Sequence, residues 1–231
     1  MDERFPDEFV TWHHKTPIGV KVDEVFGMEI KNGRVWLELA KQIYCEQGEP
    51  NYREINHFSS GVPYLENYPG RISITHTDHF LAVAMLPKTP EINLEFFNPR
   101  SSMGIDAERT DRKQVLNVRQ KFLSENELEI IPEDNLILNV QAWTIKEALY
   151  KAALTPGIDI RKNLQIKTMP LISENPLGKE SSQIGIAYIL FPKENGKDHD
   201  LQEMKLYSYI SYGNCVSIAI SSKCATYGKD R

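Results

Sequence analysis

Hydrophobic residues recur every three or four positions around residue 147, and this period is the clearest pattern in the chain. Its apolar members are Ile145, Ala148, Leu149 and Ala152. Such spacing places side chains on one face of an α-helix. Trp143, Glu147 and Lys151 fall roughly on the opposite side, and the last two are one helical turn apart. The segment 141–151 is therefore predicted to be an amphipathic helix that presents a carboxylate and a lysine together.

Other segments have the pattern of helices or of strands. Helices are expected over 34–46, which is bounded by Asn-Gly and Gly-Glu-Pro, and over about 113–123, which is rich in basic residues. Short apolar runs bounded by turn residues predict strands. These strands are expected within 61–65, over 71–75, 80–86 and 103–108, and repeatedly between about 164 and 222.

The chain divides into two halves of similar size. Prolines at 87, 90 and 99 and the polar stretch 98–102 mark the junction, so we expect subdomains over 1–102 and 103–231. The segments 73–85 and 208–220 have equal length, a polar centre and a small apolar ending. We therefore predict an α+β fold of two pseudo-symmetric α/β subdomains with the active site at their interface. Chance similarity between two amphipathic strands is the alternative.

Length and composition describe an ordinary globular chain of 231 residues, 41% of them hydrophobic. A formal charge of -5 and a pI near 5.7 argue against nucleic acid bound through a broad basic surface. The N-terminal residues MDERFP lack the apolar core of a secretory signal, and no run approaches the ~18 apolar residues of a membrane span. Three cysteines without metal-ligand spacing favour a reducing compartment, so a cytoplasmic location and no membrane partner are expected.

Two acidic residues in the predicted strand 103–108 are candidate metal ligands. Side chains alternate along a strand, so Asp106 and Glu108 point to one side, about 7 Å apart, while Ile105 and Ala107 face the core. Together with Glu147 they would suit Mg²⁺, which prefers carboxylates, phosphates and water. The alternative is an edge strand whose solvated acids pair with Arg109 or Arg112.

Two other motifs carry candidate phosphate ligands, each with a plainer interpretation. Glu147 and Lys151 could provide a carboxylate for a metal and a lysine for a phosphate, or only a surface ion pair of about 0.3 to 0.5 kcal/mol. Thr75 and His76 lie at the end of a predicted strand and could donate hydrogen bonds to an anion. A lone histidine there could equally be an ordinary loop residue.

These motifs, in this order, resemble the 4'-phosphopantetheinyl transferase superfamily, in particular its longer, surfactin-synthetase-activating (Sfp-type) branch. That pattern has a hydroxyl residue before histidine, then Gly-Ile/Val-Asp-x-Glu, then Trp-Ser/Thr-x-Lys-Glu-Ala/Ser-x-x-Lys. The matching residues are Thr75-His76, Gly104 to Glu108 and Trp143 to Lys151. The segment KFLSENE at 121–127 also looks like the family's connection, and the resemblance spans about 34–220.

The resemblance implies an enzyme of the holo-acyl-carrier-protein synthase type. Such an enzyme moves 4'-phosphopantetheine from coenzyme A to a carrier-protein serine and releases adenosine 3',5'-bisphosphate. It implies Mg²⁺ held by Asp106, Glu108 and Glu147, with Glu147 as the general base, directly or through a water. Lys151 would contact the coenzyme diphosphate, while Thr75 and His76 would hold a coenzyme phosphate.

The nucleotide end of the coenzyme is matched less closely. Arg34 and Lys41 occupy places comparable to basic residues that grip the 3'-phosphate in this branch, although both could be ordinary solvated helix residues. Val62 stands where the family often has the lysine of Gly-Lys-Pro. Arg71 or Lys146 is expected to compensate, unless the nucleotide is held less tightly.

The family's carrier partner is usually acidic, and a basic cluster beside the predicted metal strand would attract it. Its members are Arg109, Arg112, Lys113, Arg119 and Lys121. The alternative is an ordinary solvated helix face. A monomer is expected, because both halves of the site lie in one chain. Two other functional classes stay open: another Mg²⁺-dependent phosphoryl-transfer enzyme, such as a nuclease or nucleotide hydrolase, and a non-catalytic coenzyme-binding module.

Overall fold

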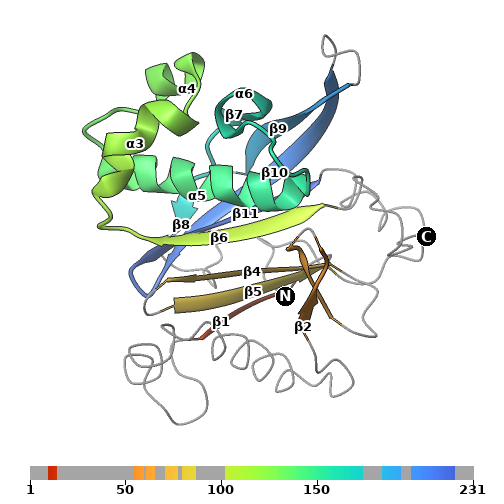
Figure 1. Ribbon diagram of the computed structural model, residues 1–231. Helices are drawn as coiled ribbons and strands as arrows, with labels where there is room; N and C mark the ends of the chain where they lie inside the picture. The colour runs from red at the N-terminus through yellow and green to blue at the C-terminus, as the bar shows by residue number, and fades with distance from the viewer. Residues whose placement is uncertain are drawn as a thin grey trace, which may run out of the picture.

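The computed structural model describes residues 10–14, 55–59, 61–65, 71–77, 80–86, 102–173, 184–193 and 199–221. These residues form three layers: helices, a six-stranded sheet beneath them, and a three-stranded sheet beneath that (Figure 1). The α+β class predicted from the sequence is confirmed. Among the described residues, none of the helices has the length and apolar character needed to cross a membrane.

The strands of the six-stranded sheet all come from the second half of the chain. Its main path runs β6 (Met103–Arg109), β11 (Asn214–Ser221), β10 (His199–Ser211), β9 (Gly185–Pro192) and β7 (Leu164–Thr168), all antiparallel. The short β8 (Ile172–Ser173) pairs with β10 in parallel. Tyr212 and Gly213 join β10 to β11 with φ of 49° and 74°, as a two-residue hairpin turn with two left-handed residues requires.

The three-stranded sheet comes from the first half and has the order β1-β5-β4. Its strands are β1 (Val10–His14), β5 (Phe80–Leu86) and β4 (Arg71–Thr77). The predicted strands over 71–75 and 80–86 are thus confirmed, with β4 two residues longer. A separate pair joins β2 (Ile55–His57) to β3 (Pro63–Leu65), which confirms the short strand expected within 61–65.

Four helices are described, and the longest, α5 (Leu136–Ala153), contains the segment predicted as amphipathic. It begins five residues before that segment, where the Asn135 side chain accepts a hydrogen bond from the Leu138 amide at 3.1 Å and caps the helix. The others are α3 (Gln114–Phe122), which confirms the basic helix, α4 (Glu125–Ile130) and α6 (Ile160–Asn163). The helix expected over 34–46, most of the junction at 98–102, Cys45 and Cys224 lie outside the described residues.

Helix α5 is buried on more than one side. The predicted stripe packs on β6 and β11, and its residues Ile145, Ala148, Leu149 and Ala152 are all buried. On another side Trp143 packs against Phe122 of α3, with the ring planes 81° apart and the centroids at 5.1 Å. Lys146 is also fully buried. The helix is therefore enclosed by the sheet below and by α3 and its neighbours above.

The two sheets share one strand arrangement. In each, the first strand pairs with the second strand of a hairpin, giving β1-β5-β4 and β6-β11-β10. The hairpin ends align Thr77 with Ser211 and Phe80 with Asn214. This alignment is one residue away from the one that matches residue 73 with residue 208. The strand order is compatible with an internal repeat whose sequence alignment is shifted by one position.

The facing surfaces of the two sheets form a common apolar core. Phe80, Ala82 and Ala84 of β5 pack against buried residues of the six-stranded sheet. Those residues are Met103, Ile105, Ala107, Tyr207, Tyr209, Val216, Ile218 and Ile220. The halves are thus held together by hydrophobic burial, which stabilises by roughly 25 cal/mol per Å² of apolar area, as well as by polar contacts at the site.

Gly104 lets α5 approach β6 closely, and its replacement tests this packing. A Cβ added at Gly104 would overlap the carbonyl oxygen of Ala148 and lie 2.9 Å from the Ala152 amide nitrogen. Both obstacles are backbone atoms, so the helix itself would have to move. We expect Gly104→Ala to lower the free energy of unfolding by about 1 to 3 kcal/mol, measured by urea denaturation. Gly157→Ala is the control for a generic glycine effect, because a Cβ there meets nothing within 4 Å although its φ is 76°. A smaller loss at 104 than at 157 would contradict the close approach.

Candidate active site

The site lies where β4 of the first half meets β6 and α5 of the second. Among the described strands, β6 pairs only with β11 in the six-stranded sheet, and its other edge faces β4. Two hydroxyl groups of β4 satisfy amides along that edge: Ser73 Oγ accepts from Ile105 N and Thr75 Oγ1 accepts from Ala107 N, both at 3.0 Å. Side chains thus take the place of a strand partner, and they bring Thr75 beside Asp106.

Asp106 is nearly buried and has two hydrogen-bond donors, one from each half of the chain. Its Oδ1 accepts from Lys151 Nζ at 2.7 Å and from Thr75 Oγ1 at 3.1 Å. Lys151 also donates to the carbonyl oxygens of Ile105 at 3.0 Å and Ile74 at 3.3 Å. The lysine therefore connects β4, β6 and α5 at one point, and its ion pair is with Asp106 (2.7 Å).

Glu147 lies one helical turn before Lys151 and is half-buried. Burial raises the pKa of its carboxyl above the ordinary value, the nearby charge of Asp106 raises this pKa further, and Lys151 opposes both. The coupling means that two carboxylates and one ammonium share this part of the site. The sequence-predicted residues Asp106, Glu147 and Lys151 are thus brought together.

Glu108 points toward the turn that follows β6. Its Oε2 forms an ion pair with Arg112, and its Oε1 accepts from the Arg109 amide at 2.9 Å. The interpretation of an acid paired with Arg112 therefore holds for Glu108. Neither acid of the strand is solvated, however, because Asp106 and Glu108 are each only 8% exposed.

The positions of the carboxylates decide whether these residues could hold Mg²⁺. Within the described ranges no three His, Cys, Asp or Glu side chains gather closely enough to hold a metal ion. The donor chemistry nevertheless fits, because Asp106 and Glu147 are two neighbouring acids whose mutual repulsion a cation relieves. Both hydrogen bonds to the Asp106 carboxylate end on Oδ1, so Oδ2 accepts none from the described residues. Glu108 would join this pair only by leaving Arg112.

An open cavity of about 600 Å³ lies beside the acid cluster. Its lining residues are His76, Thr77, Glu108, Arg109, Asp111, Arg112 and Gln114. His76 is exposed there, whereas Thr75 is buried and its hydroxyl is engaged with Asp106 and Ala107. The sequence carried no signal for Asp111 or Gln114, because nothing local marks a residue as lining a cavity formed by two distant strands.

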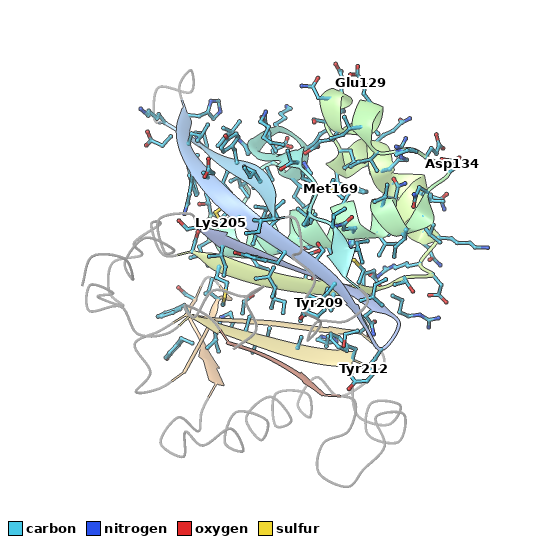
Figure 2. The ribbon with its side chains drawn as sticks, turned by 180° about the vertical axis from the view of Figure 1, so that it is seen from behind. Glu129, Asp134, Met169, Lys205, Tyr209 and Tyr212 are labelled. Carbon is cyan, nitrogen blue, oxygen red and sulfur yellow. The ribbon has the colours of Figure 1, made fainter. Side chains whose placement is uncertain are left out.

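The tips of the two hairpins meet at the same end of the molecule. Thr77 donates through Oγ1 to Asn214 Oδ1 at 2.9 Å, and the rings of Phe80 and Tyr212 lie 6.4 Å apart. Figure 2 shows Tyr212 at the tip of the β10–β11 hairpin, next to the ends of β4 and β5. Contacts between the halves therefore continue from the acid cluster to the hairpin tips.

Lys146 does not replace the lysine absent at Val62, so this one of the alternatives is wrong, whereas compensation by Arg71 stays a prediction. Its Nζ forms an ion pair with Glu127 at 2.8 Å and also donates to the carbonyl oxygens of Ile160 and Leu164. The lysine is fully enclosed and cannot reach a nucleotide. Val62 itself is half-buried. The side chain of Arg71, together with Arg34 and Lys41, lies outside the described residues.

The basic cluster proposed for carrier docking is smaller than the sequence suggested. Arg119 is buried, with Nε donating to Asn139 Oδ1 at 3.1 Å and Nη2 to the Ile131 carbonyl at 2.5 Å. It anchors α3 to α5 and belongs to no docking face. Of the other four residues, Arg109 pairs with Asp111 at 2.7 Å and Arg112 pairs with Glu108. Lys113 and Lys121 are exposed.

The fold and the site define an α+β protein with acids and a lysine at the junction of two sheets. Residues 102–196 match the model of the 4'-phosphopantetheinyl transferase superfamily. The match covers the segment from Ser102, just before β6, past the end of β9, and it includes Asp106, Glu108, Glu147 and Lys151. The superfamily predicted from the motifs is thereby confirmed. A search of curated proteins found no match to the chain.

Proposed function

We propose that this protein transfers 4'-phosphopantetheine from coenzyme A to a serine of an acyl or peptidyl carrier protein. The observation that carries the proposal is the convergence of Asp106, Glu147 and Lys151 where α5, β6 and β4 meet. These residues lie inside the segment that matches the superfamily. We also propose the holo-acyl-carrier-protein synthase type and the Sfp-type branch, on the strength of the motif order.

The reaction joins the carrier serine to the β-phosphorus of coenzyme A. The serine oxygen forms the new phosphorus–oxygen bond, and the bond from that phosphorus to the bridging oxygen breaks. Adenosine 3',5'-bisphosphate leaves with the electron pair of that bond. Glu147 takes the hydroxyl proton, directly or through a water.

Asp106, Glu108 and Glu147 are the residues that would hold Mg²⁺. When bound, the ion neutralises charge on the diphosphate and on the leaving oxygen. Lys151 already compensates the Asp106 carboxylate, and with coenzyme present its ammonium would turn to the diphosphate. Glu108 would then turn toward the ion and give up its ion pair with Arg112. The site thus contains cations that balance its acids before substrate arrives.

The remaining coenzyme contacts are assigned to the first half of the chain. His76 lies in the cavity beside the acid cluster and would donate to a coenzyme phosphate. Arg34 and Lys41 would hold the 3'-phosphate. On this proposal residues 1–102 form a subdomain for coenzyme contacts, residues 103–231 carry the metal and catalytic residues, and the two are pseudo-symmetric, as the shared strand order supports.

The carrier protein would dock beside the cavity mouth. Arg109 ends β6, and Arg112, Lys113 and Lys121 lie on the turn and helix that follow it. These four residues offer local positive charge to an acidic carrier. Asp111 partly offsets this charge through its ion pair with Arg109. We propose a monomer, because every residue assigned to the reaction comes from one chain.

The decisive experiment is intact-mass spectrometry of an apo carrier protein incubated with the enzyme, coenzyme A and Mg²⁺. Transfer adds one phosphopantetheine to the carrier serine, and a chelator should prevent it. A carrier with its acceptor serine changed to alanine is the matched control. Absence of any mass gain across fatty-acid, polyketide and peptide carriers would refute the proposal. Hydrolysis of coenzyme A or nucleotides without carrier would favour another phosphoryl-transfer enzyme, and coenzyme binding alone would favour a non-catalytic module.

A further inference from the structure

Two hydroxyl residues of β4 hold the edge of β6 in the same way but differ in one contact. Ser73 and Thr75 are both buried, and each hydroxyl oxygen accepts one β6 amide at 3.0 Å. Thr75 alone also donates its hydroxyl hydrogen to a carboxylate, Asp106 Oδ1, at 3.1 Å. This additional bond links an inter-strand contact to the proposed metal ligand.

The same geometry leaves Thr75 unable to donate to a phosphate. A threonine hydroxyl has one hydrogen, and here that hydrogen is directed at Asp106. Phosphate oxygens are acceptors, so a contact with them requires a donor. The lining of the neighbouring cavity includes the next two residues, His76 and Thr77, but not Thr75.

We propose that Thr75 is a positioning residue, which fixes the Asp106 carboxylate for the metal rather than binding a coenzyme phosphate. The inference rests on the proposed function, because it assumes that Asp106 is a metal ligand. A hydrogen bond to an ionised carboxylate oxygen is stronger than one between neutral groups, and it restricts the rotation of the carboxylate. With Oδ1 held by Thr75 and Lys151, the carboxylate presents Oδ2 in a defined direction. Partners of this kind typically change metal affinity 10- to 100-fold when removed.

Thr75 and His76 are neighbours in one motif but have different tasks. Thr75 acts across the junction on the second half of the chain, and His76 faces the cavity. Metal affinity therefore depends on a residue of the first half that never touches the metal. A separated second half would bind the metal more weakly for the same reason.

Four full-length variants test the role of the hydroxyl. Thr75→Val keeps the shape and removes the hydroxyl, and Thr75→Ser keeps the hydroxyl. Ser73→Ala is the matched control, because it removes an equal inter-strand bond that touches no carboxylate. Thr75→Ala is a second deletion, whose smaller side chain leaves room for water to reach the Ala107 amide that loses its hydroxyl partner in both variants. Mn²⁺ binding is measured by electron paramagnetic resonance without coenzyme, and stability is measured in a chelator.

The expected result separates positioning from simple stabilisation. Thr75→Val and Thr75→Ala should raise the Kd for Mn²⁺ about 10-fold or more, and Thr75→Ser should restore it. Ser73→Ala should lose comparable stability yet keep the parental Kd. Coenzyme A affinity in the chelator should be unchanged in all Thr75 variants. An unchanged Kd for Mn²⁺ in Thr75→Val, or a selective loss of coenzyme affinity in the chelator, would overturn the proposal.

The outcome is distinguishable from failure of the proposed function. If the parent protein transfers phosphopantetheine but Thr75→Val binds Mn²⁺ normally, the function stands and the positioning role is wrong. If the parent transfers nothing while Thr75→Val still weakens Mn²⁺ binding, the positioning role stands and the function is wrong. A parent protein that binds no Mn²⁺ would refute both the proposed metal site and the role of Thr75.

Discussion

Glu147→Gln should reduce the rate of phosphopantetheine transfer by about 10²- to 10⁴-fold, the usual contribution of a general base, while the protein stays folded. Glutamine has the same shape but cannot take the serine proton, and it weakens the carboxylate set proposed for Mg²⁺. The rate is measured by the mass gain of an apo carrier with time. Glu129→Gln makes the same chemical change at an exposed position of α4 and should leave the rate unchanged.

The difference in stability between Glu147→Gln and the parent should depend on pH in a defined direction. Glu147 has a raised pKa in the folded protein, so the folded state binds more protons than the unfolded chain between the two pKa values. The free energy of unfolding therefore falls as pH rises through that window, and glutamine removes this loss. In a chelator, Glu147→Gln should be at least as stable as the parent at neutral pH. Its advantage should vanish below the ordinary carboxyl pKa of 4.5. Retained transfer, or a variant less stable at neutral pH, would contradict these assignments.

Lys146→Met should lower the free energy of unfolding by about 3 to 5 kcal/mol, because it removes one partner of a buried ion pair. The Lys146 and Glu127 side chains are 0% and 2% exposed. Glu127 also accepts from the Ile166 amide at 2.6 Å and from the Ser124 amide at 2.7 Å, where it completes a capping box at the start of α4. An unpaired carboxylate at this place would disturb α4 and β7 together. Urea denaturation measures the loss.

A double variant separates loss of the ion pair from loss of packing. In Glu127→Gln/Lys146→Met the buried charge is gone, and the glutamine oxygen can still accept from one of the two backbone amides, whereas its NH2 group cannot accept from the other. The double variant should therefore be more stable than the sum of the two single losses predicts. Lys121→Met, at an exposed position near the end of α3, is the matched control and should change stability little. A loss in Lys146→Met no larger than that of the control would show that the pair contributes nothing.

The sequence predicted α5 through its apolar stripe, and the same reasoning failed at Lys146. A single helical stripe predicts one buried face and leaves charged residues on the other side to solvent. Here α3 packs on that other side, and Lys146 contacts Glu127 of α4 and the Ile160 carbonyl oxygen of α6. The ion pair with Glu127 makes the burial of a lysine tolerable. Arg119 is enclosed by the same layer. Local periodicity contains no information on a second covering layer, so both residues were assigned to the surface.

Local sequence patterns also failed to predict the burial of the acids on β6. The alternation of Ile105, Asp106 and Ala107 predicted a strand with an acidic outer side, and the strand is confirmed. Its acids are nevertheless buried, because α5 packs on their side of the strand and β4 closes the edge beside Asp106. Motif order was enough to name Asp106, Glu147 and Lys151 as partners. The bond from Thr75 to Asp106 depends on how two strands from different halves align, which no local pattern encodes.

The way β4 closes the edge of β6 has a consequence for dividing the protein. Ser73 and Thr75 occupy amides that an edge strand would otherwise leave open, along a strand of seven residues. A fragment that began at residue 102 would expose this strand as a template for a neighbouring molecule, because unpaired main-chain donors recruit other strands. Such a fragment should associate with its own copies through β6. The hydroxyl pair of β4 thus also protects the second half against self-association.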